Sequence, residues 1–134
     1  MAESGKGFDL ASLVAKETAR VTFVNPLTGK EIPDLWMDVY SKDSEQFQRA
    51  ENKINAKRWR KLRTRSGNID PAEQRHDEVE LLAACIANWG GPWELDGKPI
   101  QYSPQNAMTV LEKVPAIREQ LDLFVGDRSN FLAV

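Results

Sequence analysis

Side chains suited to catalysis or metal binding are scarce in this chain of 134 residues. It has one histidine, His76, and one cysteine, Cys85. His76 falls in the charged first turn of an expected helix, so we interpret it as a solvated side chain rather than a base or a ligand. Cys85 lies among apolar neighbours and is interpreted as a buried, unreactive thiol. One residue of each type gives neither a Cys/His metal set nor a Ser-His-Asp triad in a suitable setting.

The sequence also lacks the common phosphate-binding loops. Neither a GxxxxGK(S/T) nor a GxGxxG pattern occurs, and Gly90-Gly91 is interpreted as a helix terminator rather than a phosphate cradle. The sequence therefore predicts a protein that is not an enzyme and that uses no cofactor and no metal.

The strongest charge feature is a basic segment, residues 49–65, between two acidic segments of a chain with a net charge of −2. Its cations surround Trp59, and a basic run with an aromatic residue can bind a phosphate backbone. A solvated helix face or a protein-binding face is favoured over nucleic acid, because the whole chain is acidic. The same asymmetry permits head-to-tail association between copies of the chain. The candidate partner-binding residues in this segment are Arg58, Trp59, Arg60 and Arg63.

The elements that must carry these residues begin with an N-terminal arm, residues 1–18, predicted to be flexible or loosely docked. Residues 19–134 are predicted to form a single domain. Its first part is a predicted β-hairpin, in which two runs rich in β-branched and aromatic residues flank an Asn-Pro-Leu-Thr-Gly turn. Pro33 suggests that the second strand starts late or lies at a sheet edge. Alternation along that strand places three residues on one face, namely Leu35, Met37 and Val39.

Four main helices are predicted from apolar spacing and capping signals. The first covers about 44–62 and is broken by residues 66–68. The second covers about 70–89, the third begins at Ser103-Pro104, and the fourth covers about 115–126. The second is the expected central helix, and its apolar stripe consists of Val79, Leu82, Ile86 and Trp89.

The stretch 86–106 contains helix-stop, hairpin and helix-start signals in close succession. Its two tryptophans are expected to pin these turns together. The overall expectation is a mainly α fold with a small β-hairpin (α+β), as a compact helical domain of about four to five helices. The residues with expected structural roles are Trp89, Gly90, Gly91, Trp93, Asp96, Gly97, Ser103 and Pro104.

Three features indicate the compartment. No apolar run approaches the roughly 20 residues that span a bilayer. The N-terminus lacks the basic and apolar regions of a signal peptide. A single cysteine suits a reducing environment. The sequence therefore predicts a cytoplasmic protein without membrane contact.

The order of features from Leu81 to Leu132 resembles the tail assembly chaperones of long-tailed (siphovirus-like) bacteriophages and their prophages. The shared pattern is an apolar helix running into a turn-rich segment, then a helix, a Pro break and a further helix. The upstream order of hairpin and helix is also similar, so the resemblance extends over residues 19–134. Gln105 stands where an acidic residue is often found, which affects only capping. The matching residues are Trp93, Leu95, Asp96, Gly97, Pro99, Ile100, Tyr102, Ser103, Gln105, Asn106, Asp127, Arg128, Asn130 and Phe131.

The resemblance implies a protein that acts in the cytoplasm of the bacterial host and assists tail assembly without joining the mature virion. Such chaperones bind the long, helix-rich tape measure protein, keep it soluble and promote polymerisation of the tail tube protein around it. A longer, frameshifted form is common in the family. The candidate contact surfaces are then the basic helix face and the apolar tail, Phe131 and Leu132. Two alternatives stay open: a structural minor tail or connector protein of the virion, and a nucleic-acid-binding regulator that uses segment 49–65.

Overall fold

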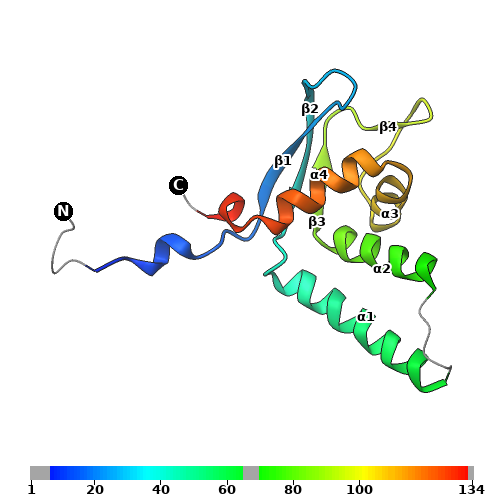
Figure 1. The fold of residues 1–134 in the computed structure, drawn as a ribbon. Coiled ribbons are helices and arrows are strands. Elements are labelled where there is room, and N and C mark those ends of the chain that lie inside the picture. Colours follow the sequence, from blue (N-terminus) through cyan, green and yellow to red (C-terminus); the bar gives the residue numbers. More distant parts are fainter. Residues whose placement is uncertain (1–6, 65–69, 133–134) are drawn as a thin grey trace.

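The computed structural model describes residues 7–64 and 70–132, and these residues form an α+β domain (Figure 1). The predicted helix break at residues 66–68 lies outside the described residues. The elements in chain order are η1 (Leu10–Leu13), β1 (Ala19–Val24), β2 (Glu31–Val39), α1 (Glu45–Thr64), α2 (Pro71–Ala84), β3 (Ile86–Gly90), β4 (Glu94–Leu95), β5 (Lys98–Pro99), α3 (Pro104–Lys113), α4 (Pro115–Gly126) and η2 (Arg128–Phe131), where η marks a 3-10 helix.

A three-stranded antiparallel sheet forms the centre of the domain, in the order β1-β2-β3. Met37 of the central strand pairs with Val21 of β1 on one side and with Trp89 of β3 on the other. The predicted alternation in β2 is confirmed, since Leu35, Met37 and Val39 are all buried. Helix α4 crosses the sheet, α3 lies beside α4, and α2 packs against α3; α1 folds back on α2 to form a helical hairpin, in which α1 is the helix that extends away from the sheet (Figure 1).

The predicted fold class was wrong in its β content. A mainly α domain with a small β-hairpin was expected, but the described residues contain a three-stranded sheet, to which β3 adds an unpredicted strand, beside the two-stranded sheet β4-β5, whose turn was predicted. The main error is at the second helix, which ends at Ala84 rather than near Trp89. Residues Ile86–Gly90 form β3 instead, paired with β2, and Ile86 and Trp89 are buried in the core in this register.

The prediction that Pro33 marks a late start or a sheet edge was also wrong. Pro33 lies inside β2, which begins at Glu31 and is the central strand. The missing N–H of Pro33 leaves the sheet intact. On one side, β3 pairs with β2 only from Trp36 onward; on the other, the register with β1 shifts between Thr22 and Val24, so neither neighbour pairs directly with Pro33. Asp34, the next residue, has a positive φ of 61° at this irregularity.

The helical hairpin is joined by charged side chains more than by apolar ones. Helix α1 begins where the Ser44 hydroxyl accepts a hydrogen bond from the Phe47 N–H, at 3.2 Å. Among the α1 residues whose side chains are described, only Ile54 is buried. None of the helices in the described part of the chain is long and apolar enough to cross a membrane.

Candidate protein-binding site

An apolar groove lies at the end of the sheet where β1 turns into β2, and its cavity measures about 410 Å³. In Figure 1 this turn and the β4 loop lie at the same end of the molecule. Most of the lining side chains are apolar, and Glu94 is the one charged residue among them. The lining residues are Val24, Asn25, Pro26, Leu27, Ile32, Leu35, Pro92, Trp93, Glu94, Leu95, Val110, Val114, Ala116 and Ile117.

One wall of the groove is the β1–β2 turn, which places a leucine in solvent. The Asn25 side chain accepts a hydrogen bond from the Leu27 N–H at 2.9 Å, and the Asn25 N–H donates to the Lys30 carbonyl at 2.8 Å. Gly29 completes the turn with a φ of 72°. The Leu27 side chain is consequently 94% exposed. A single exposed leucine is common on protein surfaces, but Leu27 adjoins the apolar lining of the groove, and apolar patches of this kind mark contact sites.

The opposite wall is α4, which a glutamine fastens to the end of β1. The Gln120 side-chain amide accepts from the Val24 N–H at 2.8 Å and donates to the Val24 carbonyl at 2.9 Å. These two bonds satisfy backbone groups that have no strand partner at this edge. They also fix the spacing between the strand and the helix, so the groove is held open by the fold itself.

Trp93 lines the groove and packs against Trp89, which in turn packs against Tyr102; we define these three residues as the tryptophan cluster. The Trp93 indole N–H donates to the Gly90 carbonyl at 2.9 Å, and the ring lies 5.1 Å from that of Trp89. The Trp89 indole N–H donates to the Ile100 carbonyl at 3.1 Å, and Tyr102 packs edge-on against Trp89 at 5.4 Å. Both indoles are therefore buried and anchored.

The other residues assigned structural roles lie around this cluster, but the prediction that Gly90-Gly91 ends a helix was wrong, because α2 ends at Ala84 and Gly90 is the last residue of β3. Gly91 has a φ of 97°, and Asp96 and Gly97 have φ values of 54° and 78° in the β4–β5 turn. The Ser103 hydroxyl accepts from the Asn106 N–H at 3.0 Å, and Pro104 occupies the first turn of α3. Gly90 packs so closely on the Trp36 ring that an added Cβ would lie 2.2 Å from it.

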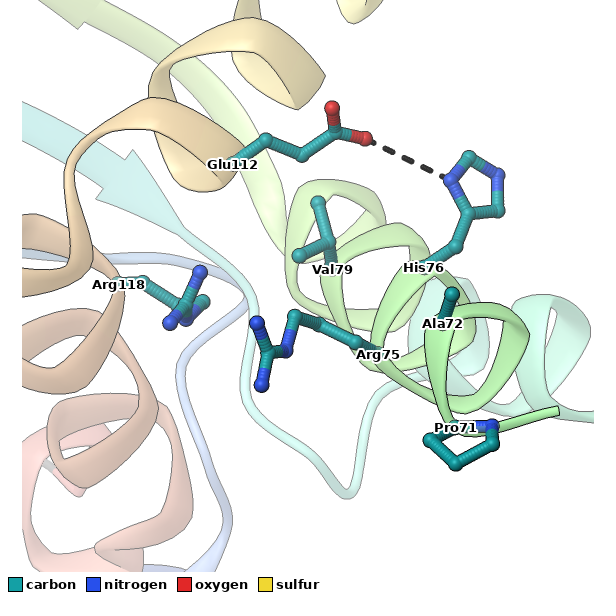
Figure 2. A pocket seen from close by; sticks show the side chains of 7 residues that line it. All are labelled: Pro71, Ala72, Arg75, His76, Val79, Glu112 and Arg118. Atoms are coloured by element: carbon teal, nitrogen blue, oxygen red, sulfur yellow. Dashed lines mark ion pairs between the residues drawn. The ribbon is translucent and has the colours of Figure 1, made fainter.

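A second cavity, of about 490 Å³, opens between α2, α3 and α4 (Figure 2). Arg75 from α2 and Arg118 from α4 extend toward each other in it, and Val79 of α2 also lines it. His76 lies at its rim, half-exposed, with Nδ1 3.5 Å from Glu112 and Nε2 3.7 Å from Glu80. These contacts suit a solvated side chain. Among the residues that line this cavity there is no hydroxyl or thiol nucleophile for the imidazole to activate.

The thiol of Cys85 is buried, as predicted. Burial raises its pKa to about 12, the nearby Lys42 acting in the opposite direction. The thiol therefore stays protonated at neutral pH and is a poor nucleophile. In the described residues no group of three or more His, Cys, Asp or Glu side chains could hold a metal ion.

The structure separates the two sets of predicted partner-binding residues. Trp59 is 67% exposed on α1, near Arg60 and Arg63, which are also exposed. Phe131, by contrast, is fully buried and packs edge-on against Phe124 at 5.7 Å. Leu132 is half-buried and forms a β-bridge with Ala15. The apolar tail therefore belongs to the core and to its junction with the N-terminal arm.

The basic segment is partly neutralised by α2. The buried Asp77 carboxylate accepts hydrogen bonds from Lys57 at 2.9 Å and from Arg58 at 3.1 Å. Lys61 pairs with Glu73 at 2.6 Å. Burial alone raises the pKa of Asp77, but the bonds from the two cations outweigh it and lower the pKa below its ordinary value. Arg58 is thus a structural residue of the helical hairpin.

Sequence reasoning missed the groove and Asp77. The turn at Leu27 carried one signal, since a leucine is an unusual choice between Pro and Thr in an exposed turn. Asp77 also carried a signal in its spacing. Glu73 and Asp77 are four residues apart, as are Lys57 and Lys61. Because the two helices are antiparallel, Asp77 meets Lys57 and Glu73 meets Lys61.

Comparison with known proteins adds no identification. No model of a known protein family matches the chain, no curated protein is significantly similar to it, and no solved structure matches its fold.

Proposed function

We propose that this chain is a non-catalytic tail assembly chaperone of a long-tailed bacteriophage or prophage. It binds the tape measure protein in the cytoplasm of the bacterial host, keeps it soluble, promotes polymerisation of the tail tube protein and is absent from the mature virion. The apolar groove is the observation that supports a binding function. The resemblance carried by residues 81–132 supports the identity of the client.

The groove suits a helical client. Its lining is apolar, it is open to solvent, and an exposed leucine stands at its rim. An amphipathic helix presents apolar side chains at a spacing of three and four residues, and such a stripe can enter a groove of this kind. Many weak contacts of this type along a long client would hold it in solution through multivalency.

The basic segment supports a nucleic-acid role less well. Lys57, Arg58 and Lys61 already contact carboxylates of α2, so these cations are partly neutralised before any phosphate arrives. A phosphate backbone is bound by cations that release its counterions, and a neutralised cation contributes little to that release.

Co-expression with the tape measure protein tests the proposal. The chain should keep the tape measure protein in the soluble fraction and co-purify with it. Leu27→Asp should reduce the recovered client about tenfold, the effect of losing roughly 1.4 kcal/mol of binding free energy. Leu123→Asp is the matched control, because Leu123 is 77% exposed and lies outside the groove.

Two results would reject the proposal. One is a tape measure protein that precipitates to the same extent with and without the chain. The other is the presence of the chain at fixed copy number in purified virions, measured by mass spectrometry, which would indicate a structural tail protein. Salt-sensitive binding to DNA that Arg60→Glu and Arg63→Glu abolish would instead support the regulator.

A further inference from the structure

The cavity between α2, α3 and α4 places two arginine side chains opposite each other (Figure 2). Arg75 enters it from α2 and Arg118 from α4, and their guanidinium groups extend toward each other. Like charges that face each other repel, so this arrangement costs free energy in the chain on its own. An anion placed between the two groups would replace that repulsion by two attractions.

Neither guanidinium group pairs with a carboxylate in the described part of the chain. Arg75 is exposed and makes no hydrogen bond or ion pair with residues 7–64 or 70–132. The Arg118 Nη1 donates to the Leu111 carbonyl at 3.0 Å, which fixes this side chain at the C-terminal end of α3. That bond uses one of the five N–H donors of a guanidinium group, and its acceptor carries no net charge. Both positive charges therefore remain available to an anion.

The rest of the cavity favours a carboxylate on an aliphatic chain over a more highly charged anion. Val79 is fully buried at the cavity wall, and Pro71 and Ala72 line it from the first turn of α2. This apolar wall can cover the methylene groups of an acidic side chain. Among the described residues that line the cavity, Glu112 is the only carboxylate, and it points to His76, whose Nδ1 lies 3.5 Å away. Because Glu112 stays close, it repels a doubly charged phosphate more than a single carboxylate.

We propose that this cavity binds a carboxylate of an acidic protein segment, which is held between Arg75 and Arg118. A planar carboxylate matches the forked donors of guanidinium groups and can accept two hydrogen bonds from each fork. The cavity measures about 490 Å³ and Arg75 at its mouth is exposed, so a side chain that projects from another protein can enter. None of the described residues lines both this cavity and the apolar groove. The inference therefore adds a second, polar binding site and does not rest on the proposed function.

An NMR titration of the full, isotope-labelled chain tests this inference with three probes. The first is a peptide blocked at both ends with a central glutamate between two leucines, the second is the same peptide with glutamine, and the third is inorganic phosphate. The glutamate peptide should shift the amide signals of the cavity residues and bind about tenfold more tightly than the glutamine peptide, which lacks the charged acceptor. Both peptides carry the same leucines, so binding in the apolar groove is equal for the two. Phosphate should bind more weakly than the glutamate peptide.

Arg75→Gln separates binding from folding, because this side chain is exposed. The variant should bind the glutamate peptide about tenfold more weakly, since one of the two charged donors is lost. Its melting temperature should stay the same or rise, since one of two facing cations is removed. Arg49→Gln is the matched control, because Arg49 is an exposed arginine of α1 outside the cavity, and it should leave the affinity unchanged.

Four results would each overturn the inference. They are equal binding of the two peptides, phosphate binding as tight as that of the glutamate peptide, an unchanged affinity in Arg75→Gln, and a loss in Arg49→Gln equal to that in Arg75→Gln. No tape measure protein is present in the titration, so these outcomes are independent of whether the chain is a tail assembly chaperone.

Discussion

The sheet region and the helical hairpin α1–α2 are held together by different forces. The sheet and the helices that cover it share one apolar cluster, in which Phe23, Met37 and Leu121 are fully buried and the two indoles of the tryptophan cluster are anchored. Helix α2 also belongs to this cluster through Val79 and Leu82, but α1 is joined to α2 through carboxylates and cations, with Asp77 at the centre. Apolar burial depends little on pH, whereas ion pairs depend on it strongly. The two regions should therefore respond differently to the same kind of substitution.

Two tryptophans, one in each region, should give the largest contrast. Trp93→Ala should lower the free energy of unfolding by about 3–5 kcal/mol, because it removes a buried ring and leaves a cavity. Trp59→Ala on α1 should change it by no more than about 0.5 kcal/mol, because that ring is 67% exposed. Urea unfolding followed by circular dichroism measures both values. A cost for Trp59→Ala equal to that for Trp93→Ala would show that α1 is packed against more of the protein than the structure shows.

Two glycines with similar backbone conformations should give the next contrast. Gly91 and Gly29 both have positive φ, at 97° and 72°. A Cβ at Gly91 would lie 1.9 Å from the Asp34 carbonyl oxygen, whereas one at Gly29 meets nothing within 4 Å. Gly29→Ala should cost about 1 kcal/mol from backbone strain alone. Gly91→Ala should cost about 3 kcal/mol, because the β2 backbone must also shift. If thermal or urea unfolding showed equal losses of unfolding free energy for the two variants, the close contact between Gly91 and Asp34 would contribute nothing to the cost.

The contrast between the two regions also explains which parts of the fold the sequence could predict. Local signals placed the β4–β5 turn at Asp96-Gly97 and the start of α3 at Ser103, because turn and cap preferences act over a few residues. They failed at β3, where Ile86 and Trp89 continue the helical spacing of Val79 and Leu82. Residues 86–90 can also form a short strand, and which structure forms depends on pairing with β2, about 50 residues earlier in the chain.

The candidate site was harder to predict because it combines distant segments. The groove brings together the β1–β2 turn, the β4 loop and the ends of α3 and α4. A local sequence pattern does not indicate that segments so far apart in the chain lie next to each other. The sequence predicts Phe131 as a contact residue, whereas the structure buries it. Its burial depends on α4, which supplies Phe124 as its partner. Charge patterns in the basic segment were visible, but their pairing with α2 requires the helices to be antiparallel.

A smaller effect should follow from removing the central charge of the hairpin. Asp77→Asn should lower the free energy of unfolding at pH 7 by about 2 kcal/mol, since hydrogen bonds from two cations lose their charged acceptor. The full cost of a broken buried pair is not expected, because the Lys57 and Arg58 side chains are 37% and 32% exposed and can regain water. Glu73→Gln, at a pair whose two side chains are about 40% exposed, is the matched control and should cost less than about 1 kcal/mol. The reverse order of the two losses would contradict a central role for Asp77.

The pH dependence of the Asp77→Asn difference should be the finest test. The two hydrogen-bonding cations hold the pKa of Asp77 below its ordinary value of 3.8, despite the opposing effect of burial. The stabilisation from this carboxylate is therefore fully present above the unfolded-state pKa and is lost as pH falls through the lower, folded-state pKa. The difference in free energy of unfolding between the unaltered chain and Asp77→Asn should stay constant from about pH 7 to 5 and shrink below pH 4.

Comparing the two proteins at each pH isolates Asp77 from other carboxylates. Arg128 lowers the pKa of Asp43, and hydrogen bonds from Ser129 lower that of Asp127, so acid destabilises both proteins through groups outside the hairpin. Those contributions cancel in the difference. Trp93→Ala provides the opposite reference, because its cost comes from apolar burial and should remain the same over this range. If the Asp77→Asn difference were also constant down to pH 3, the carboxylate would not be the group that holds α1 to α2.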